Sequence, residues 1–308
     1  MATLRDIKRS IVGVRSTQKI TKAMKMVATA KLRRAQQNIV NARPYANKIG
    51  EMLSHLATDD ELSSNQFFTS HENKKLAIVV ITADRGLCGA FNTNILREAV
   101  HFINEEFKAE NAMVQVYTVG KKASEFFGKR NYDVLGKQTG IFSPLVYQTA
   151  LDIYNELVPK FLNKELDRIV LVYNEFVSLI QQRIVKIQLL PIPFISKTEE
   201  EKHYPPNLPA RSQSDFAPAK AGYIFEPDQL SIFHYLIPKH LKAQLWRALL
   251  ESNAAELGAR MTAMDNATTN AQELIRSLNL TYNKERQAAI TKEILEIVSG
   301  ANALRASS

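Results

Sequence analysis

The sequence predicts an α/β protein in which two long terminal helices pair as an antiparallel coiled coil, with a Rossmann-like α/β domain inserted between them. Apolar residues recur at alternating steps of three and four near the N-terminus, and again at helical spacing near the C-terminus. Between the two ends, short β-branched runs alternate with amphipathic segments, which is typical of an open α/β sheet.

We expect the N-terminal shaft helix to occupy residues 1–57. From Leu4 to Leu56, thirteen of the sixteen positions in the stripe are apolar when alanine is counted. A helix of this length would extend roughly 80 Å. Pro44 is expected to kink it, because the proline ring clashes with the preceding turn and has no amide hydrogen to donate. Three contiguous stripe positions are polar, namely Gln18, Thr21 and Lys25. Over this stretch we expect the apolar face to shift sideways to Ile20, Met24 and Val27.

The C-terminal shaft helix is expected over residues 228–308, with Asp228 or Ser231 as its N-terminal cap. No proline follows Pro238. Pairing of the two terminal helices within one chain is the simplest arrangement, and a homodimeric coiled coil is the alternative. The expected apolar seam comprises Leu250, Ala254, Leu257, Met261, Met264, Thr268, Ala271, Ile275, Leu278 and Tyr282, and a second, phase-shifted seam comprises Ile290, Ile294, Ile297, Ala301 and Leu304.

Residues 75–195 are expected to form the α/β globular domain. A polar loop or insert should follow over residues 196–227, which are rich in proline, serine and charge. Within the domain, the predicted helices are 92–108, 120–129 and 144–166, the last interrupted at Pro159. The predicted strands are 75–82, 113–119, 132–135, 168–173 and 180–190, the last antiparallel to its predecessor.

The formal charge of +9 is concentrated at the N-terminus. Residues 1–57 contain twelve lysines and arginines and two acids, whereas the other 251 residues contain 28 bases and 29 acids. Such a basic helix suits an acidic partner, which could be nucleic acid, an anionic membrane surface or an acidic protein segment. Tyr45 is the only aromatic residue before position 57, so the aromatic residues of many nucleic-acid interfaces are missing.

The strongest candidate for a chemical site is the turn at residues 83–92, where phosphate-binding turns are found between a strand and a helix. Gly86 and Gly89 do not complete a dinucleotide-binding motif, and the chain has no P-loop sequence. We therefore attribute the two glycines to the backbone geometry of a tight turn and not to ligand binding. Cys88 lacks a sequence signature for an activating base, and the six histidines show no metal-binding spacing. We expect no catalytic residue, cofactor or metal.

The chain is expected to lack a transmembrane segment, because no apolar run approaches the roughly 20 residues that a membrane helix needs. A single cysteine, Cys88, suits a reducing compartment. Charged, helically patterned residues begin by Arg5, so we expect neither a secretory signal nor a mitochondrial transit peptide.

Several strings, in order and with intact spacing, resemble the gamma-subunit family of F-type ATP synthases. Near the N-terminus these are Leu4–Arg9, Thr17–Lys19 and Ile20–Ala28. The turn Asp84–Gly89 resembles the motif that opens the family's globular domain. The C-terminal matches are Met264–Ala271 and Asn283–Thr291.

The resemblance implies a non-catalytic central stalk in a proton-translocating ATP synthase. Rotation of the membrane ring (c-ring) would turn this shaft inside a hexamer of alpha and beta subunits. The shaft would thereby couple hydrogen ion transport to ATP synthesis or hydrolysis. An epsilon-type subunit is a further implied partner, and nucleic acid is not one. The implied location is the cytoplasmic side of a bacterial inner membrane, as a peripheral protein.

The resemblance also implies which residues touch the catalytic beta subunit. Met24, Lys25 and Cys88 match positions near an acidic lever segment of that subunit. Positions that hydrogen-bond one of its loops are matched by Arg286, Gln287 and Thr291. The chloroplast members carry a regulatory cysteine pair, which a chain with one cysteine should lack.

Three further hypotheses stay open from the residues alone. A structural coiled-coil adaptor with an α/β head is the main alternative. A nucleic-acid-binding protein would use the basic helix, and an enzyme would use a cofactor on the α/β domain. The insert at 196–227 is expected to modulate contacts at the foot of the shaft.

Overall fold

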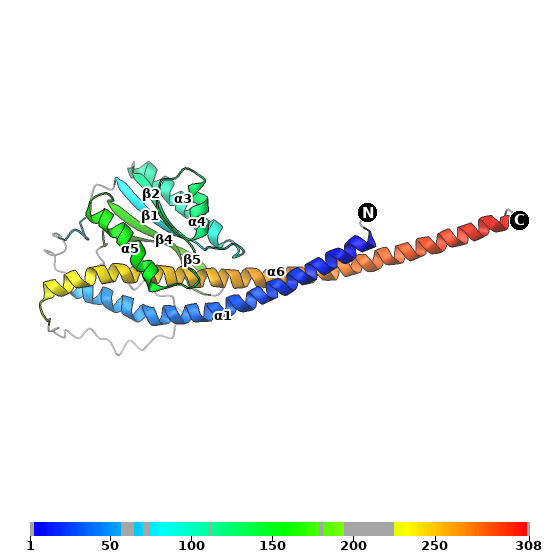
Figure 1. The fold of residues 1–308 in the computed structure, drawn as a ribbon, viewed down its shortest axis with the longest axis horizontal. Coiled ribbons are helices and arrows are strands. Elements are labelled where there is room, and N and C mark those ends of the chain that lie inside the picture. Colours follow the sequence, from blue (N-terminus) through cyan, green and yellow to red (C-terminus); the bar gives the residue numbers. More distant parts are fainter. Residues whose placement is uncertain are drawn as a thin grey trace. The chain divides into compact units, whose positions relative to one another are not determined.

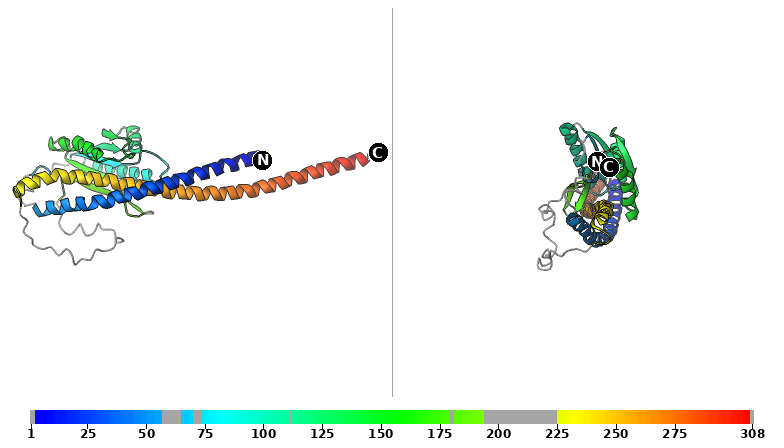
Figure 2. Two further views of the ribbon diagram at one scale, coloured as in Figure 1. Left: turned by 60° about the horizontal axis from the view of Figure 1, so that its bottom comes forward. Right: turned by 90° about the vertical axis from the view of Figure 1, so that its left-hand side faces the viewer.

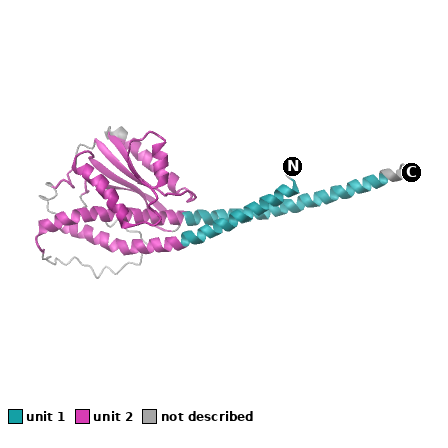
Figure 3. Cartoon of the chain, in the orientation of Figure 1, with its two compact units in different colours: residues 1–29, 260–308 teal, residues 30–259 magenta. Residues whose placement is uncertain are grey.

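The computed structural model describes residues 3–56, 65–69, 74–110, 112–178, 181–193 and 225–306. The chain divides into two compact units, which Figure 3 distinguishes by colour. Unit 1 comprises residues 1–29 and 260–308, and unit 2 comprises residues 30–259. Two helices contribute to both units, α1 (Leu4–Leu56) and α6 (Gln229–Ala306).

Unit 2 is built on a five-stranded sheet with the strand order β3-β2-β1-β4-β5 (Figure 1). Its inner strands pair in parallel, and β5 is antiparallel to β4, as the sequence predicts. The strands are β1 (Lys75–Ile81), β2 (Met113–Val119), β3 (Val134–Gln138), β4 (Arg168–Phe176) and β5 (Gln182–Leu190).

Helices cover both faces of this sheet. Successive side chains of a strand point to opposite faces, so an apolar strand such as β1 presents apolar residues to the helices on each side. Ile78 and Val80 of β1 pack beneath α3 (Phe91–Glu110) and α4 (Lys121–Gly128). Val79 and Ile81 point the other way, into a core shared with α5 (Tyr147–Leu162). The result is a three-layer, Rossmann-like arrangement.

The first turns of α6 belong to the core of unit 2. The core on the α5 side includes apolar residues of α6 at steps of four, so one continuous stripe of the helix faces the sheet. These residues are Phe233, Ile237, Leu241, Leu245 and Leu249.

Segments of α1 and α6 pair antiparallel in each unit. In unit 1, Thr21 bonds Thr268 (Oγ1–Oγ1, 2.8 Å) and Lys25 bonds Asp265 (Nζ–Oδ1, 2.6 Å), so residue numbers rise along one helix and fall along the other. In unit 2, Arg43 faces Glu251, and Figure 2 shows the corresponding stretches side by side. The structure therefore confirms the predicted fold class of a helical pair with an inserted α/β domain.

Side chains cap the start of each long helix. Thr3 and Asp6 form reciprocal bonds, in which the Asp6 amide donates to Thr3 Oγ1 and the Thr3 hydroxyl donates to Asp6 Oδ2. At α6, the Ser231 amide donates to Asp228 Oδ1 across 2.8 Å. Asp228 therefore provides the N-terminal cap of α6.

The predicted sideways shift of the α1 stripe is wrong. Thr21 stays on the buried face, whereas Ile20 and Val27 are both 57% exposed. Thr21 tolerates burial because its hydroxyl bonds Thr268, which also occupies a seam position of α6. In the second α6 seam, Ile290, Ile294 and Ile297 are exposed.

The boundaries of several elements differ from the prediction by one to four residues. Helix α5 continues through Pro159 to Leu162, whereas we expected an interruption there. Pro159 and Asn155, whose carbonyl would accept a bond from residue 159, are both exposed, so water can satisfy that carbonyl. Strand β3 begins at Val134, two residues later than expected.

Most of the predicted insert at 196–227 lies outside the described residues, which resume at position 225. The division into shaft helices over 1–57 and 228–308 and a domain over 75–195 stays a prediction. Helix α1 passes through Pro44 without ending there.

Candidate interaction surfaces

Lys25 and Met24 lie on the part of α1 in unit 1. Lys25 is half-buried, and its ammonium pairs with Asp265 of α6, which is itself exposed. Met24 is also half-buried. An ion pair this accessible contributes under about 1 kcal/mol, so Lys25 can exchange Asp265 for an acidic group of a partner at little cost.

The remaining cations of α1 in unit 1 point to solvent. Among the described residues, no acidic side chain pairs with any of them, so the basic face is open to an acidic partner. These cations are Arg5, Lys8, Arg9, Arg15, Lys19 and Lys22.

The C-terminal end of α6 extends beyond its pairing with α1. The bonds at Thr268 and Asp265 place Leu4 opposite roughly residue 285, if both helices rise equally. Arg286, Gln287 and Thr291 are all exposed at this end, and residues 291–302 are exposed throughout. Gln287 and Thr291, four positions apart, share one face of the helix.

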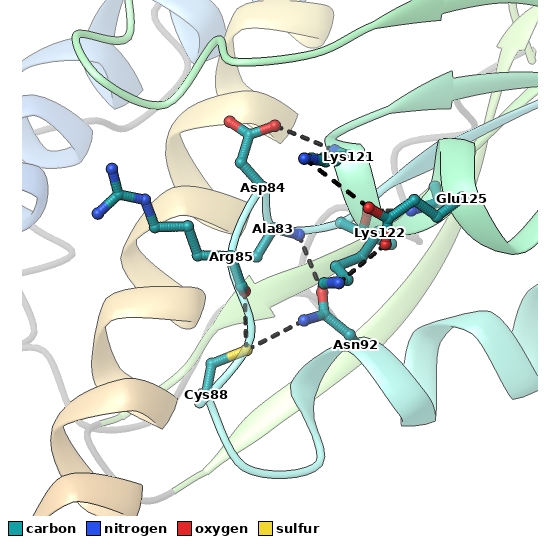
Figure 4. A network of polar contacts seen from close by, with 10 residues as sticks. Ala83, Asp84, Arg85, Cys88, Asn92, Lys121, Lys122 and Glu125 are labelled. Atoms are coloured by element: carbon teal, nitrogen blue, oxygen red, sulfur yellow. Dashed lines mark hydrogen bonds and ion pairs between the residues drawn. The ribbon is translucent and has the colours of Figure 1, made fainter.

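The turn at residues 83–92 is held by its own side chains (Figure 4). The Asp84 carboxylate accepts hydrogen bonds from the backbone amides of Lys121 (3.0 Å) and Gly140 (2.8 Å). Asn92 accepts a bond from the Ala83 amide at 3.0 Å. Gly89 adopts a positive φ of 59°, a conformation that favours glycine, which supports the backbone-geometry interpretation of this turn.

Cys88 is buried at this turn in unit 2, packed with Phe91 and with Ala255 of α6. Asn92 Nδ2 donates to its sulfur across 3.1 Å. The neighbouring Leu87 is exposed and adopts a positive φ of 64°. A partner would therefore contact Leu87 and Arg85 at the surface of this turn, whereas Cys88 is buried and packs the turn against unit 2.

Among the residues that the structure describes, no helix combines the length and the apolar character that crossing a bilayer requires.

A family model described as ATP synthase matches residues 3–304. The ATP synthase gamma chain of Chlorobaculum tepidum is 47% identical over 308 residues, covering 99% of this chain and 100% of the relative. This chain belongs to the ATP synthase gamma chain family. The gamma chain of Chloroherpeton thalassium is 45% identical, with both chains covered over their full length.

Solved structures share the fold of this family member. A chain of the Euglena gracilis mitochondrial ATP synthase (OSCP/F1/c-ring) superposes with a TM-score of 0.65 at 23% identity, covering 99% of this chain and 95% of its own length. A chain from the central stalk and c-ring of the Tetrahymena thermophila mitochondrial ATP synthase gives 0.58 at 24% identity, covering 80% and 99%.

Sequence reasoning missed two residues at these surfaces. Asp265 lies in a quoted C-terminal string, but only the helix pairing reveals it as the partner of Lys25. Asp84 was assigned to the turn without a role, because the amides that it caps lie 37 and 56 residues away. The available signal for Asp84 was its position, since it is an acidic residue close after a predicted buried strand.

Proposed function

We propose that this chain is the central-stalk rotor of a proton-translocating ATP synthase. It transmits rotation of the membrane c-ring to the catalytic beta subunits and so drives ATP synthesis, or hydrolysis in reverse. The observation that carries the proposal is full-length similarity to ATP synthase gamma chains, at 45–47% identity for the relatives described above.

The geometry of unit 1 supports a shaft. Two antiparallel helices of different sequence form a pair without rotational symmetry, so three identical neighbours would each meet a different surface. A shaft can shift the populations of partner conformers only through such differential contacts. Apolar residues near the end of α6 are exposed, including Ile294 and Ile297, which suits contacts with surrounding subunits.

The contact residues follow as part of the same proposal. The basic face of α1, with Met24 and Lys25, meets an acidic lever of the beta subunit, and the turn containing Cys88 lies near that lever in the assembled enzyme. Arg286, Gln287 and Thr291 hydrogen-bond a loop of a beta subunit. Their exposure in this chain supports these roles for the α6 residues.

We further propose that the chain performs no chemistry itself. At the most phosphate-like turn, the Asp84 and Asn92 side chains are already bonded to backbone amides, which supports this view. The chain would be peripheral to a bacterial inner membrane, on its cytoplasmic side, with the alpha subunits and an epsilon-type subunit as further partners.

Reconstitution tests the proposal. The chain is mixed with alpha and beta subunits from its own organism, the complex is isolated, and ATP hydrolysis is assayed. We expect one copy per hexamer and sustained turnover above that of alpha and beta alone. A chain that joins no active hexamer would instead support the coiled-coil adaptor.

A further inference from the structure

Three tyrosines on three helices of unit 2 are largely exposed, and the ring of one of them contacts a lysine. Tyr45 of α1, Tyr147 of α5 and Tyr235 of α6 are 56%, 43% and 63% exposed. The ammonium of Lys239 lies 4.1 Å from the ring centroid of Tyr235. A hydrogen bond to Tyr235 raises the pKa of Lys239, and the nearby Tyr45 and Tyr147 phenols act in the same direction.

A second lysine and the only tryptophan extend this cluster along α6. Lys242 Nζ lies 4.6 Å from the ring centroid of Tyr154. The Trp246 ring meets Tyr147 edge to face at 5.6 Å. We name this surface the tyrosine–lysine patch, and its residues are Tyr45, Tyr147, Tyr235, Lys239, Lys242 and Trp246.

The two ammonium groups of the patch have ring faces as partners instead of carboxylates. Among the described residues, no acid forms an ion pair with Lys239 or Lys242. A cation over a ring keeps N–H donors that can bind an anion. Phenol hydroxyls add further donors at the same surface. The patch therefore offers positive charge and hydrogen-bond donors beside exposed aromatic area.

This chemistry fits a protein segment that carries carboxylates. Tyrosine and tryptophan are enriched in protein interfaces, where they bury much area with few rotatable bonds. An anionic membrane surface selects clusters of four to eight cations, and nucleic acid likewise needs many phosphate contacts. Two lysines are too few for either ligand.

We propose that the tyrosine–lysine patch binds an acidic segment of a partner protein, with glutamates or aspartates on Lys239 and Lys242 and apolar side chains against the tyrosines. The inference goes beyond the rotor function, because it concerns a surface of unit 2 and none of the residues proposed to touch the beta subunit.

Trp246 allows the proposal to be tested in the isolated full-length chain. As the only tryptophan, it reports occupancy of the patch through its fluorescence. The probe is a synthetic ten-residue peptide that alternates glutamate with leucine and phenylalanine. A matched peptide with glutamine in place of glutamate isolates the contribution of charge. We expect saturable binding of the glutamate peptide, weakened by salt, and much weaker binding of the glutamine peptide.

Variants make the test specific. Lys239→Gln/Lys242→Gln should bind the glutamate peptide about tenfold more weakly. Lys129→Gln/Lys137→Gln removes two exposed lysines elsewhere in unit 2 and should bind it as the parent does. Lys239→Glu/Lys242→Glu should lose the glutamate peptide and gain a lysine version of it, which a misfolded variant could not do.

Three results would overturn the proposal. One is equal response to the glutamate and glutamine peptides, and another is unchanged binding in the Lys239/Lys242 variants. The third is preferential binding of phosphatidylserine vesicles or single-stranded DNA. Each leaves the reconstitution experiment unaffected, so failure of this inference is distinguishable from failure of the rotor proposal.

Discussion

Arg247 donates its Nε hydrogen to Glu251 Oε1 across 2.9 Å, one turn further along α6, and the Glu251 side chain is completely buried. Arg43 of α1 approaches the same oxygen at 3.7 Å. Burial raises the pKa of Glu251, and the charge of Arg247 opposes that shift. One carboxylate thus joins guanidinium groups from both long helices within unit 2.

Replacing Glu251 with alanine should destabilise the chain. Removing one partner of a buried ion pair typically costs roughly 3–5 kcal/mol. Here we expect about 2 kcal/mol, because both arginines keep partial access to water. Urea unfolding of the full chain measures the change, with Glu125→Ala as the control, because that side chain lies at the surface of α4 and is 39% exposed. A loss equal to that of the control would show that the buried carboxylate contributes nothing.

Stability should fall in acid because of His240. Burial lowers the pKa of His240 to about 4, below its ordinary value of 6.5. Between these two values the unfolded chain binds a proton that the folded chain does not. The His240 contribution is therefore fully present above pH 6.5 and is lost as the pH falls toward 4, by about 3 kcal/mol in total.

Urea unfolding at pH 7.5 and pH 5 checks this linkage. The loss between these two values should be smaller in His240→Gln than in the parent chain, by about 2 kcal/mol. His234→Gln controls for loss of a histidine on the same helix. Parallel pH profiles for the parent and His240→Gln would contradict the prediction.

Two glycines of unit 2 should respond oppositely to alanine. A Cβ at Gly50 would lie 3.7 Å from His240 Cε1, an ordinary contact, so Gly50→Ala should stabilise helix α1 by about 0.5–1 kcal/mol. A Cβ at Gly120 would lie 2.1 Å from the Thr82 carbonyl oxygen, at a φ of +94°. Gly120→Ala should destabilise by several kcal/mol. Thermal unfolding of both variants checks this prediction. Shifts of the unfolding temperature in the same direction for the two variants would contradict it.

Removing the exposed polar groups near the end of α6 should impair coupling and leave folding intact. In Arg286→Ala/Gln287→Ala, the free energy of unfolding should change by under about 0.5 kcal/mol, because both side chains are exposed. In the reconstituted enzyme, we expect ATP hydrolysis and proton pumping to fall severalfold. Lys284→Ala/Glu293→Ala, at exposed positions outside the proposed contacts, is the matched control. Unchanged rates in the Arg286/Gln287 variant would count against these contacts.

Most of the fold could be predicted from apolar periodicity, since burial of one face imposes it on long helices and on inner strands. Ile39 and Leu53, which lie on the predicted α1 stripe, are buried in the structure, as is Leu257 of the predicted α6 seam. The prediction failed at Thr21, because periodicity weighs hydropathy and cannot detect a hydroxyl partner 247 residues away. The candidate sites depended similarly on distant residues. The sequence placed Tyr147 and Trp246 on two separate elements, and only folding brings their rings into contact.

The stripe of α6 beneath the sheet determines how this helix moves in solution. From Phe233 to Leu249 its apolar side chains belong to the same core as β1 and β4, so this stretch cannot open without disrupting unit 2. Its amide hydrogens should exchange with solvent only through cooperative unfolding of that unit, whereas those of residues 291–302, which are exposed on every side, should exchange by fraying. A single continuous helix should therefore contain both slowly exchanging and rapidly exchanging amides.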